Sequence, residues 1–276
     1  ELLCRRFEDV SLERLRALGA DLWWASPPCQ PFTVRGLRRD LEDPRAATFR
    51  LLVERLSMLQ PRWFALENVA GFEDSAAHRL LRDALDTAGY ATPVERVLCP
   101  SALGWPNRRP RFYLVASREA DGASEIERAE PAARVELRDL VDPAADRDPT
   151  LVLDETTRRR YHQALHLVDR RDDDAVSRCF TSAYGRSIVR SGSYLRRPDG
   201  KVRRFSPREI ARLLGFPETF GWPDGLSVRR RSALLGRSLS LVAVRSVLAV
   251  IPGIDGPVCG LSPLERPAVS PVDLAS

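Results

Sequence analysis

Asp21-Leu22-Trp23-Trp24-Ala25-Ser26-Pro27-Pro28-Cys29-Gln30-Pro31-Phe32-Thr33 is the stretch that decides the fold. Its apolar part, residues 22–25, is short and is ended by prolines, which predicts a buried strand. Proline fixes φ and removes a backbone donor, so the loop that follows presents the Cys29 sulfur at a set place. The carboxyl end of a strand in an α/β sheet is where ligands usually bind. The stretch therefore predicts a reactive thiol, with a buried structural cysteine as the alternative.

Strand-like and helix-like segments alternate around this stretch. Further strands are expected at residues 63–66, 94–98 and 111–116, and helices are expected behind caps at Ser11, Asp43-Pro44 and either Asp74 or Ser75. This alternation predicts an α/β fold with a mostly parallel sheet and helices on both of its faces.

The second half of the chain has a different character. Residues 119–204 are charged, with blocks such as Arg158-Arg159-Arg160 and Asp172-Asp173-Asp174, and predict a smaller irregular lobe after a first domain over residues 1–118. Ser206-Pro207-Arg208-Glu209 forms a capping box that predicts a helix. We expect residues 205–251 to pack back on the first domain, with helices at 228–235 and 239–251, and residues 252–276 to form a flexible tail.

Composition points to a polyanionic partner. The 276 residues carry a formal charge of +5, and 43 are basic, of which only Lys201 is lysine. Arginine is the better ligand for phosphates and base edges, so nucleic acid is a plausible partner. An arginine bias from a GC-rich genome is the alternative explanation.

Several classes of protein are disfavoured by the sequence. The five scattered cysteines have no CxxC spacing, which favours a reducing compartment without a disulfide framework or zinc site. His162 and His166 lack the third protein ligand that a zinc site needs, so we expect no metal. The longest apolar run, residues 239–251, is too short to span a bilayer and contains Arg245. We expect a cytoplasmic monomer with no membrane partner.

Three kinds of polar group follow neighbouring predicted strands. They are the Cys29 thiol, Glu67 with Asn68, and the basic group of Arg108, Arg109 and Arg111. A thiolate, a carboxyl and a guanidinium in one cleft suit attack on an electron-poor ring. Taken singly, Glu67 could be a surface acid and the arginines a solvated loop. A cysteine hydrolase would need a histidine base, for which no local signature is present.

In these segments the sequence resembles the cytosine-5 methyltransferase family. Four segments carry the resemblance: Pro27-Pro28-Cys29-Gln30-Pro31-Phe32, Glu67-Asn68-Val69, Arg109-Pro110-Arg111, and Arg204 to Glu209 continuing through Arg212-Leu213-Leu214-Gly215-Phe216-Pro217. The resemblance implies a Rossmann-like methyltransferase sheet that uses S-adenosylmethionine, accompanied by a small target-recognition lobe.

The resemblance also implies roles for individual residues. Cys29 would add to C6 of cytosine, Glu67 would interact with N3, Arg111 would hold the base oxygen and Arg109 would help to position Glu67. The target nucleotide would be flipped out of its stack. The residues implied to bind the cofactor are Pro27, Asn68, Ser238 and Leu239.

The family has branches that act on DNA and on tRNA. Cys179-Phe180-Thr181, followed by Ala183-Tyr184-Gly185-Arg186, resembles the signature of the branch that methylates aspartate tRNA. This favours tRNA, with duplex DNA as the alternative partner; Cys179 could also be a small buried hydrophobe of the lobe. The residues implied to bind substrate are Gln30, Arg35, Cys179, Phe180, Thr181, Tyr184 and Arg186.

Two departures from the family pattern stand out. The family's Phe-x-Gly-x-Gly turn for the cofactor is not found, and the chain starts at Glu1. We therefore expect an N-terminally truncated sheet and weak binding of S-adenosylmethionine by this chain alone. Arg237 stands where the family has asparagine in Gly-Asn-Ser-Leu, so it could crowd the cofactor or could be exposed. An inactive nucleic-acid-binding remnant is thus a further hypothesis.

Overall fold

The computed structural model describes residues 4–29, 40–119, 123–126 and 134–254. Contacts between residues divide the chain into two compact units. The first consists of Glu1–Leu103, Arg109–Glu130 and Ser246–Pro252, and the second is built mainly from Gly104–Arg108 and Pro131–Arg245. Among the described residues, no helix is long and apolar enough to cross a membrane.

The first unit contains a four-stranded sheet with the strand order β1-β2-β5-β3. Its strands are β1 (Leu22–Ala25), β2 (Trp63–Val69), β3 (Val94–Leu98) and β5 (Arg111–Ser117). Only β1 and β2 pair in parallel, and β5 runs antiparallel to both β2 and β3. The prediction of a mostly parallel sheet is therefore wrong for the described strands. The reason is that residues 99–110, between β3 and β5, contain no α-helix to serve as a crossover.

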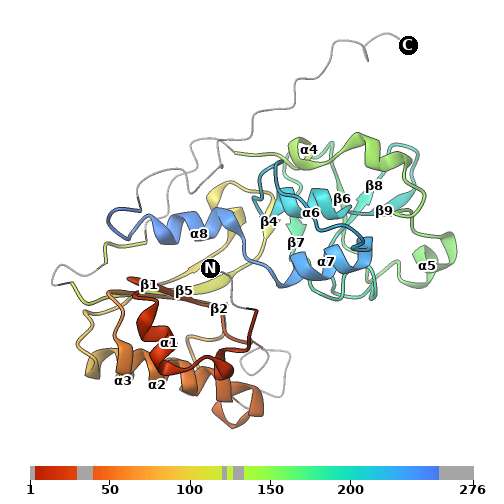
Figure 1. Ribbon diagram of the computed structural model, residues 1–276. Coiled ribbons are helices and arrows are strands. Elements are labelled where there is room, and N and C mark those ends of the chain that lie inside the picture. Colours follow the sequence, from red (N-terminus) through yellow and green to blue (C-terminus); the bar gives the residue numbers. More distant parts are fainter. Residues whose placement is uncertain (1–3, 30–39, 120–122, 127–133, 255–276) are drawn as a thin grey trace. The chain divides into compact units, whose positions relative to one another are not determined.

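Two helices of the first unit begin at the expected caps Ser11 and Ser75, whereas the expected cap Asp43 begins a 3₁₀ helix ahead of the next α-helix, which has no side-chain cap. Ser11 accepts a hydrogen bond from Arg14 N at the start of α1 (Leu12–Ala17), and Ser75 accepts one from His78 N at the start of α3 (Ala76–Thr87). Figure 1 shows α1, α2 (Ala47–Leu59) and α3 on one side of the sheet. The 3₁₀ helices in the described part of this unit are Phe7–Asp9, Asp40–Glu42, Pro44–Ala46 and Pro100–Leu103. The core of the unit includes Phe49, Leu56, Phe64, Leu81 and Phe112.

The second unit combines small sheets with short helices. Strands β4 (Asn107–Arg108) and β7 (Ser177–Arg178) pair in parallel, and a three-stranded sheet has the order β6 (Leu167–Asp169), β8 (Tyr194–Arg196), β9 (Val202–Arg204). The helices are α4 (Leu137–Leu140), the 3₁₀ helix η6 (Pro143–Arg147), α5 (Glu155–Arg160), α6 (Pro207–Leu213) and α7 (Val228–Arg237). Helix α8 (Leu241–Leu248) crosses the boundary between the units.

The boundary of the second unit differs from the expected domain division. Residues 205–245 group with residues 131–204 rather than with the first unit. The physical reason is the apolar face of α6, because Ile210, Leu213 and Leu214 are buried in one core with Phe180, Tyr184, Tyr194 and Phe205. The predicted capping box of α6 is confirmed, since Ser206 Oγ accepts from Glu209 N and the Glu209 carboxylate accepts from Ser206 N.

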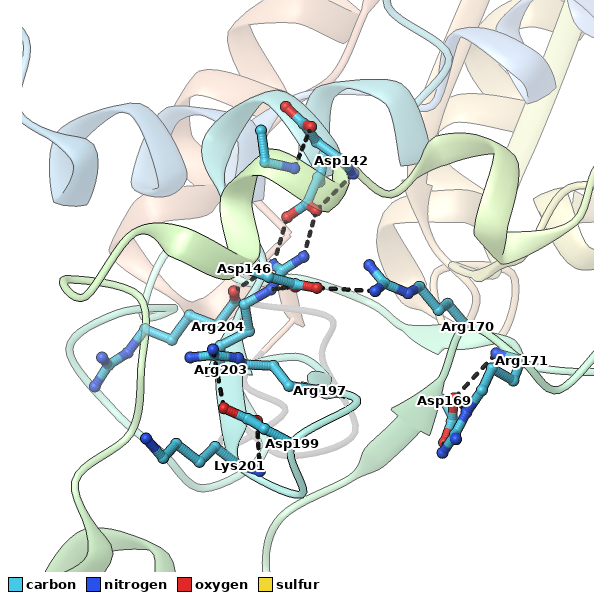
Figure 2. Close-up of polar contacts among 12 residues, drawn as sticks. Asp142, Asp146, Asp169, Arg170, Arg171, Arg197, Asp199, Lys201, Arg203 and Arg204 are labelled. Atoms are coloured by element: carbon cyan, nitrogen blue, oxygen red, sulfur yellow. Dashed lines mark hydrogen bonds and ion pairs between the residues drawn. The ribbon is translucent and has the colours of Figure 1, made fainter. Parts of the chain in front are cut away.

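A buried ion pair ties several elements of the second unit together. The guanidinium of Arg203, on β9, has no exposed area and donates to both Glu209 carboxylate oxygens, at 2.9 and 2.8 Å. Its Nε lies 2.7 Å from Asp146 Oδ1, and Arg170 Nη2 lies 2.9 Å from Asp146 Oδ2 (Figure 2). Strand β9, η6, α6 and the residue that follows β6 are thus joined by charge-assisted hydrogen bonds.

Replacement of Arg203 should destabilise the chain strongly. Arg203→Met leaves Glu209 buried without its cation, and we expect the free energy of unfolding to fall by about 3–5 kcal/mol. Arg171→Met is the matched control, because Arg171 pairs with Asp169 on the surface and its side chain is 69% exposed; its effect on stability should be small by comparison. Urea unfolding of both variants measures the difference.

The double variant Arg203→Met/Glu209→Gln separates lost charge pairing from lost packing. It removes the uncompensated charge, so part of the lost stability should return. Equal losses in Arg203→Met and Arg171→Met would contradict the role assigned to the buried pair.

Candidate active site

The parallel pairing of β1 and β2 brings the loop that carries Cys29, here called the nucleophile loop, beside Glu67, the predicted acid. Ala25 lies opposite Leu66, so Ser26, which follows β1, comes beside Glu67, which lies within β2. Ser26 is among the groups that lower the pKa of the Glu67 carboxyl, and Ser26 Oγ accepts from Trp24 Nε1 at 3.1 Å. Cys29, a free and partly exposed thiol, follows three residues after Ser26.

Glu67 is a buried carboxyl faced by guanidinium groups. It is 8% exposed, and Arg111 Nε lies 3.2 Å from its Oε1. Arg109 is 4% exposed. Burial raises the pKa of Glu67, and the charges of Arg111 and Arg109 and the Ser26 hydrogen bond lower it by less. The net upward shift increases the tendency of this carboxyl to hold a proton, as a general acid requires.

The antiparallel pairing of β5 with β2 delivers these arginines. Val69 lies opposite Arg111 in this pairing, so the segment that begins β5 returns to the end of β2 where Glu67 sits. Arg111 Nη1 also donates to Pro110 O at 2.8 Å, which restrains the guanidinium. All four residues implied to be catalytic belong to the first unit; Arg111 forms an ion pair with Glu67, and the charge of Arg109 also lowers the pKa of Glu67.

Two observations bear on the residues expected to hold the cofactor in this unit. Asn68 is 1% exposed, and its Nδ2 has no hydrogen-bond partner among the described residues. A buried donor of this kind is costly unless a ligand accepts from it. Pro27 lines an apolar cavity of about 460 Å³, together with Trp23, Trp24, Ser26 and Pro28. That volume is within the range of small-molecule sites.

The residues expected to bind substrate are divided between two parts of the chain. Gln30 and Arg35 lie outside the described residues. The others lie in residues 179–186 of the second unit, here called the recognition loop. Arg186 is exposed, and Cys179 and Thr181 are partly buried.

Phe180 and Tyr184 have a different environment from the rest of the recognition loop. Each is 1% exposed, and their rings meet edge to face with centroids 4.9 Å apart. Their side chains form part of the core of the second unit, so in this conformation they support the loop rather than offer a surface to a substrate.

The remaining predicted residues follow α7. Ser238 caps the helix and is partly buried, as is Leu239, while Arg237 is exposed. They belong to the second unit, whereas Cys29 and Glu67 belong to the first. No group of three or more potential metal ligands occurs among the residues that the structure describes.

Sequence reasoning missed Ser26 and Trp24 as parts of the site. Both lie in the quoted stretch, but their role depends on the register between β1 and β2. The sequence did contain a signal for Ser26. It is the first polar residue after the apolar run of β1, just as Glu67 is the first polar residue after the apolar run of β2.

The raised pKa of Glu67 predicts a specific pH dependence of stability. A carboxyl with a raised pKa contributes stability below its unfolded-state value, near 4.5, and loses it as the pH rises through the folded-state value. Wild type should therefore lose stability relative to Glu67→Gln as the pH increases above 4.5. Urea unfolding at a series of pH values measures the trend.

Glu95→Gln supplies a control of opposite sign. Burial raises the pKa of Glu95, but hydrogen bonds from His78 and Arg82 outweigh burial, and the pKa is lowered. Wild type should therefore lose stability relative to Glu95→Gln only as the pH falls below about 4.5. The same trend in both variants would contradict the assignment for Glu67.

Residues 5–252 match the family described as C-5 cytosine-specific DNA methylase. The chain is 29% identical to a tRNA (cytosine(38)-C(5))-methyltransferase of Mus musculus, over 91% of this chain and 81% of that protein. It is 26% identical to a DNA (cytosine-5)-methyltransferase of Dictyostelium discoideum, over 90% of this chain and 81% of that protein.

A solved structure, the S. pombe Dnmt2 methyltransferase, superposes with a TM-score of 0.78 at 27% identity, over 89% of this chain and 82% of the other. Three observations indicate the same family: the fold, the order of the motifs along the chain, and the match over nearly the whole length of the chain. The chain belongs to the C-5 cytosine-specific DNA methylase family.

Proposed function

We propose that this chain methylates C5 of a cytosine in tRNA through a covalent bond between Cys29 and the base. The observation that carries the proposal is the placement of Glu67, a buried carboxyl of raised pKa within β2, beside the strand that leads into the loop of Cys29 and 3.2 Å from Arg111 Nε. Family membership supplies the reaction class, cytosine-5 methylation.

The side chains of the first unit account for activation of the base. The Cys29 thiolate forms a bond to C6, and the C5–C6 π electrons move toward C5 and N3. Protonated Glu67 donates to N3 and so offsets the negative charge that develops on the ring. Arg111 and Arg109 hold Glu67 in place, and Arg111 would also bind the base oxygen.

Release of the product restores the thiolate. Once C5 carries the methyl group, a water molecule takes the C5 proton, the C–H electron pair re-forms the C5–C6 double bond, the bond between sulfur and C6 breaks to give the Cys29 thiolate, and the N3 proton returns to Glu67. S-Adenosylmethionine, when bound, supplies the electrophilic methyl group. The residues that would hold it are Pro27, Asn68, Ser238 and Leu239, and the unpartnered Nδ2 of Asn68 and the apolar wall at Pro27 are compatible with such a ligand.

Two observations support RNA as the substrate. The recognition loop has the sequence expected of the tRNA branch, and the mouse relative, at 29% identity, is named for a tRNA cytosine. RNA is usually read at unpaired bases that can be splayed out of a loop, so a target cytosine would reach Cys29 without the cost of opening a duplex. The Dictyostelium relative, named for DNA, keeps duplex DNA as the second candidate.

The test compares Cys29→Ser with Cys99→Ser, a second free thiol in the same unit. With radiolabelled S-adenosylmethionine in excess, wild type and Cys99→Ser should methylate a tRNA transcript in preference to duplex DNA. Cys29→Ser should lose transfer by at least about 10³-fold, because removal of a nucleophile eliminates the covalent route. Its affinity for tRNA should stay within about twofold of wild type, since a thiol contributes little to phosphate binding.

The other outcomes decide against the proposal. Transfer to duplex DNA alone would assign the second candidate. Binding of tRNA without transfer, and without heat of S-adenosylmethionine binding by calorimetry, would identify a nucleic-acid-binding remnant. Full transfer by Cys29→Ser would remove Cys29 as the nucleophile.

A further inference from the structure

The recognition loop is in direct backbone contact with the last turn of α7. A Cβ atom placed on Gly236 would lie 2.2 Å from Thr181 C, 2.5 Å from Thr181 O and 2.4 Å from Ser182 N. These are backbone atoms, so no side-chain rotation could relieve the overlap. Gly236 is not among the residues of positive φ, so contact alone excludes a side chain there.

A second glycine, Gly192, packs against the aromatic rings of the same loop. A Cβ on Gly192 would lie 2.6 Å from Phe180 Cδ1 and 2.8 Å from Tyr184 Cδ2. The loop is also anchored by hydrogen bonds. Tyr184 Oη donates to Ser193 O at 2.7 Å and accepts from Phe205 N at 2.8 Å, and Thr181 N donates to Ser191 O at 2.8 Å. The loop is thus confined between α7 and the core of the second unit.

The chain that leaves α7 is fixed as firmly as the loop. Ser238 N donates to Leu235 O at 3.0 Å, and Leu241 N donates to Leu214 O at 2.8 Å. A Cβ on Gly215 would lie 2.9 Å from a Val242 methyl carbon, which shows how closely residues 241–242 approach the end of α6. Ser238 and Leu239, the residues proposed to hold the methyl donor, lie between these fixed points.

We infer that Gly236 is a positioning residue for the methylation reaction. Its contact with Thr181 and Ser182 fixes the position of the recognition loop relative to Ser238 and Leu239. The bound RNA and the methyl donor are thereby placed correctly relative to each other. The inference rests on the proposed function, and it assigns to Gly236 a task beyond packing. Substitution should weaken capture of an unpaired RNA loop and leave the chemistry at Cys29 and Glu67 unchanged.

Gly236→Ala in the full chain tests the inference, with Gly221→Ala as the matched control. A Cβ on Gly221 would meet nothing within 4 Å, and Gly221 is exposed. By fluorescence anisotropy, Gly236→Ala should bind a tRNA transcript about tenfold more weakly, equivalent to about 1.4 kcal/mol. Gly221→Ala should stay within about twofold of wild type.

A thiol-labelling measurement reports the loop without any need for activity. Cys179 lies at the start of the loop and is partly buried, whereas Cys4 and Cys29 belong to the other unit and serve as internal references. Peptide mass spectrometry should show faster alkylation of Cys179 in Gly236→Ala, with unchanged rates at the two reference thiols. Wild-type labelling and wild-type tRNA affinity in a folded Gly236→Ala chain would overturn the inference.

Kinetics distinguish positioning from general loss of folded protein. A purely structural defect lowers the apparent kcat and leaves KM for tRNA unchanged, whereas misplacement of the loop raises KM. If circular dichroism shows that Gly236→Ala does not fold, Gly192→Ala decides, because its Cβ would press on the same loop from the other side. An unchanged tRNA affinity in folded Gly192→Ala would then overturn the inference.

Failure of the proposed function would have a separate signature. If wild type binds and methylates duplex DNA but not tRNA, the RNA assignment fails, and the same three glycine variants are compared for DNA affinity. If Gly236→Ala binds DNA more weakly than wild type and Gly221→Ala does not, the positioning role is still supported. If the two variants bind DNA equally well, the positioning role is contradicted.

Discussion

The parallel register between β1 and β2 is the constraint on which the candidate site depends. It sets Ala25 opposite Leu66, and Ser26, the first residue after β1, comes within reach of Glu67, the first polar residue of β2. Side chains alternate between the faces of a strand, so a slip of one residue would turn Glu67 to the opposite face. The prolines after Ser26 end the strand at the position where the loop to Cys29 must leave the sheet.

Glu67 and Glu209, the two glutamates that are buried among the described residues, are held in different ways. Glu209 accepts from Arg203 with both oxygens and from the backbone N–H groups of Ser206 and Asp142, at 2.7 and 2.9 Å. Such full pairing suits a carboxylate that serves the fold. Glu67 has a longer contact with Arg111, at 3.2 Å, and burial outweighs it in setting the pKa. An incompletely compensated carboxyl is the kind that can exchange a proton with a ligand.

Local features of the fold were predictable from the sequence, and long-range pairings were not. The caps at Ser11 and Ser206 depend on contacts within one turn, and the strands around Cys29 and Glu67 are defined by their own apolar runs. The direction of β5 depends on pairing across the sheet. Residues 205–245 join the second unit because α6 packs there, and the burial of Phe180 and Tyr184 likewise depends on partners distant in sequence.

The contact between Gly236 and the backbone of Thr181 limits how the recognition loop could be exchanged between relatives. A graft of residues 179–186 alone would bring a foreign backbone path against a helix that has no spare volume on that side. The loop, the segment around Gly192 and the last turn of α7 therefore form the smallest unit that could be transplanted together. Evolution of a new target preference would have to proceed by matched changes in all three.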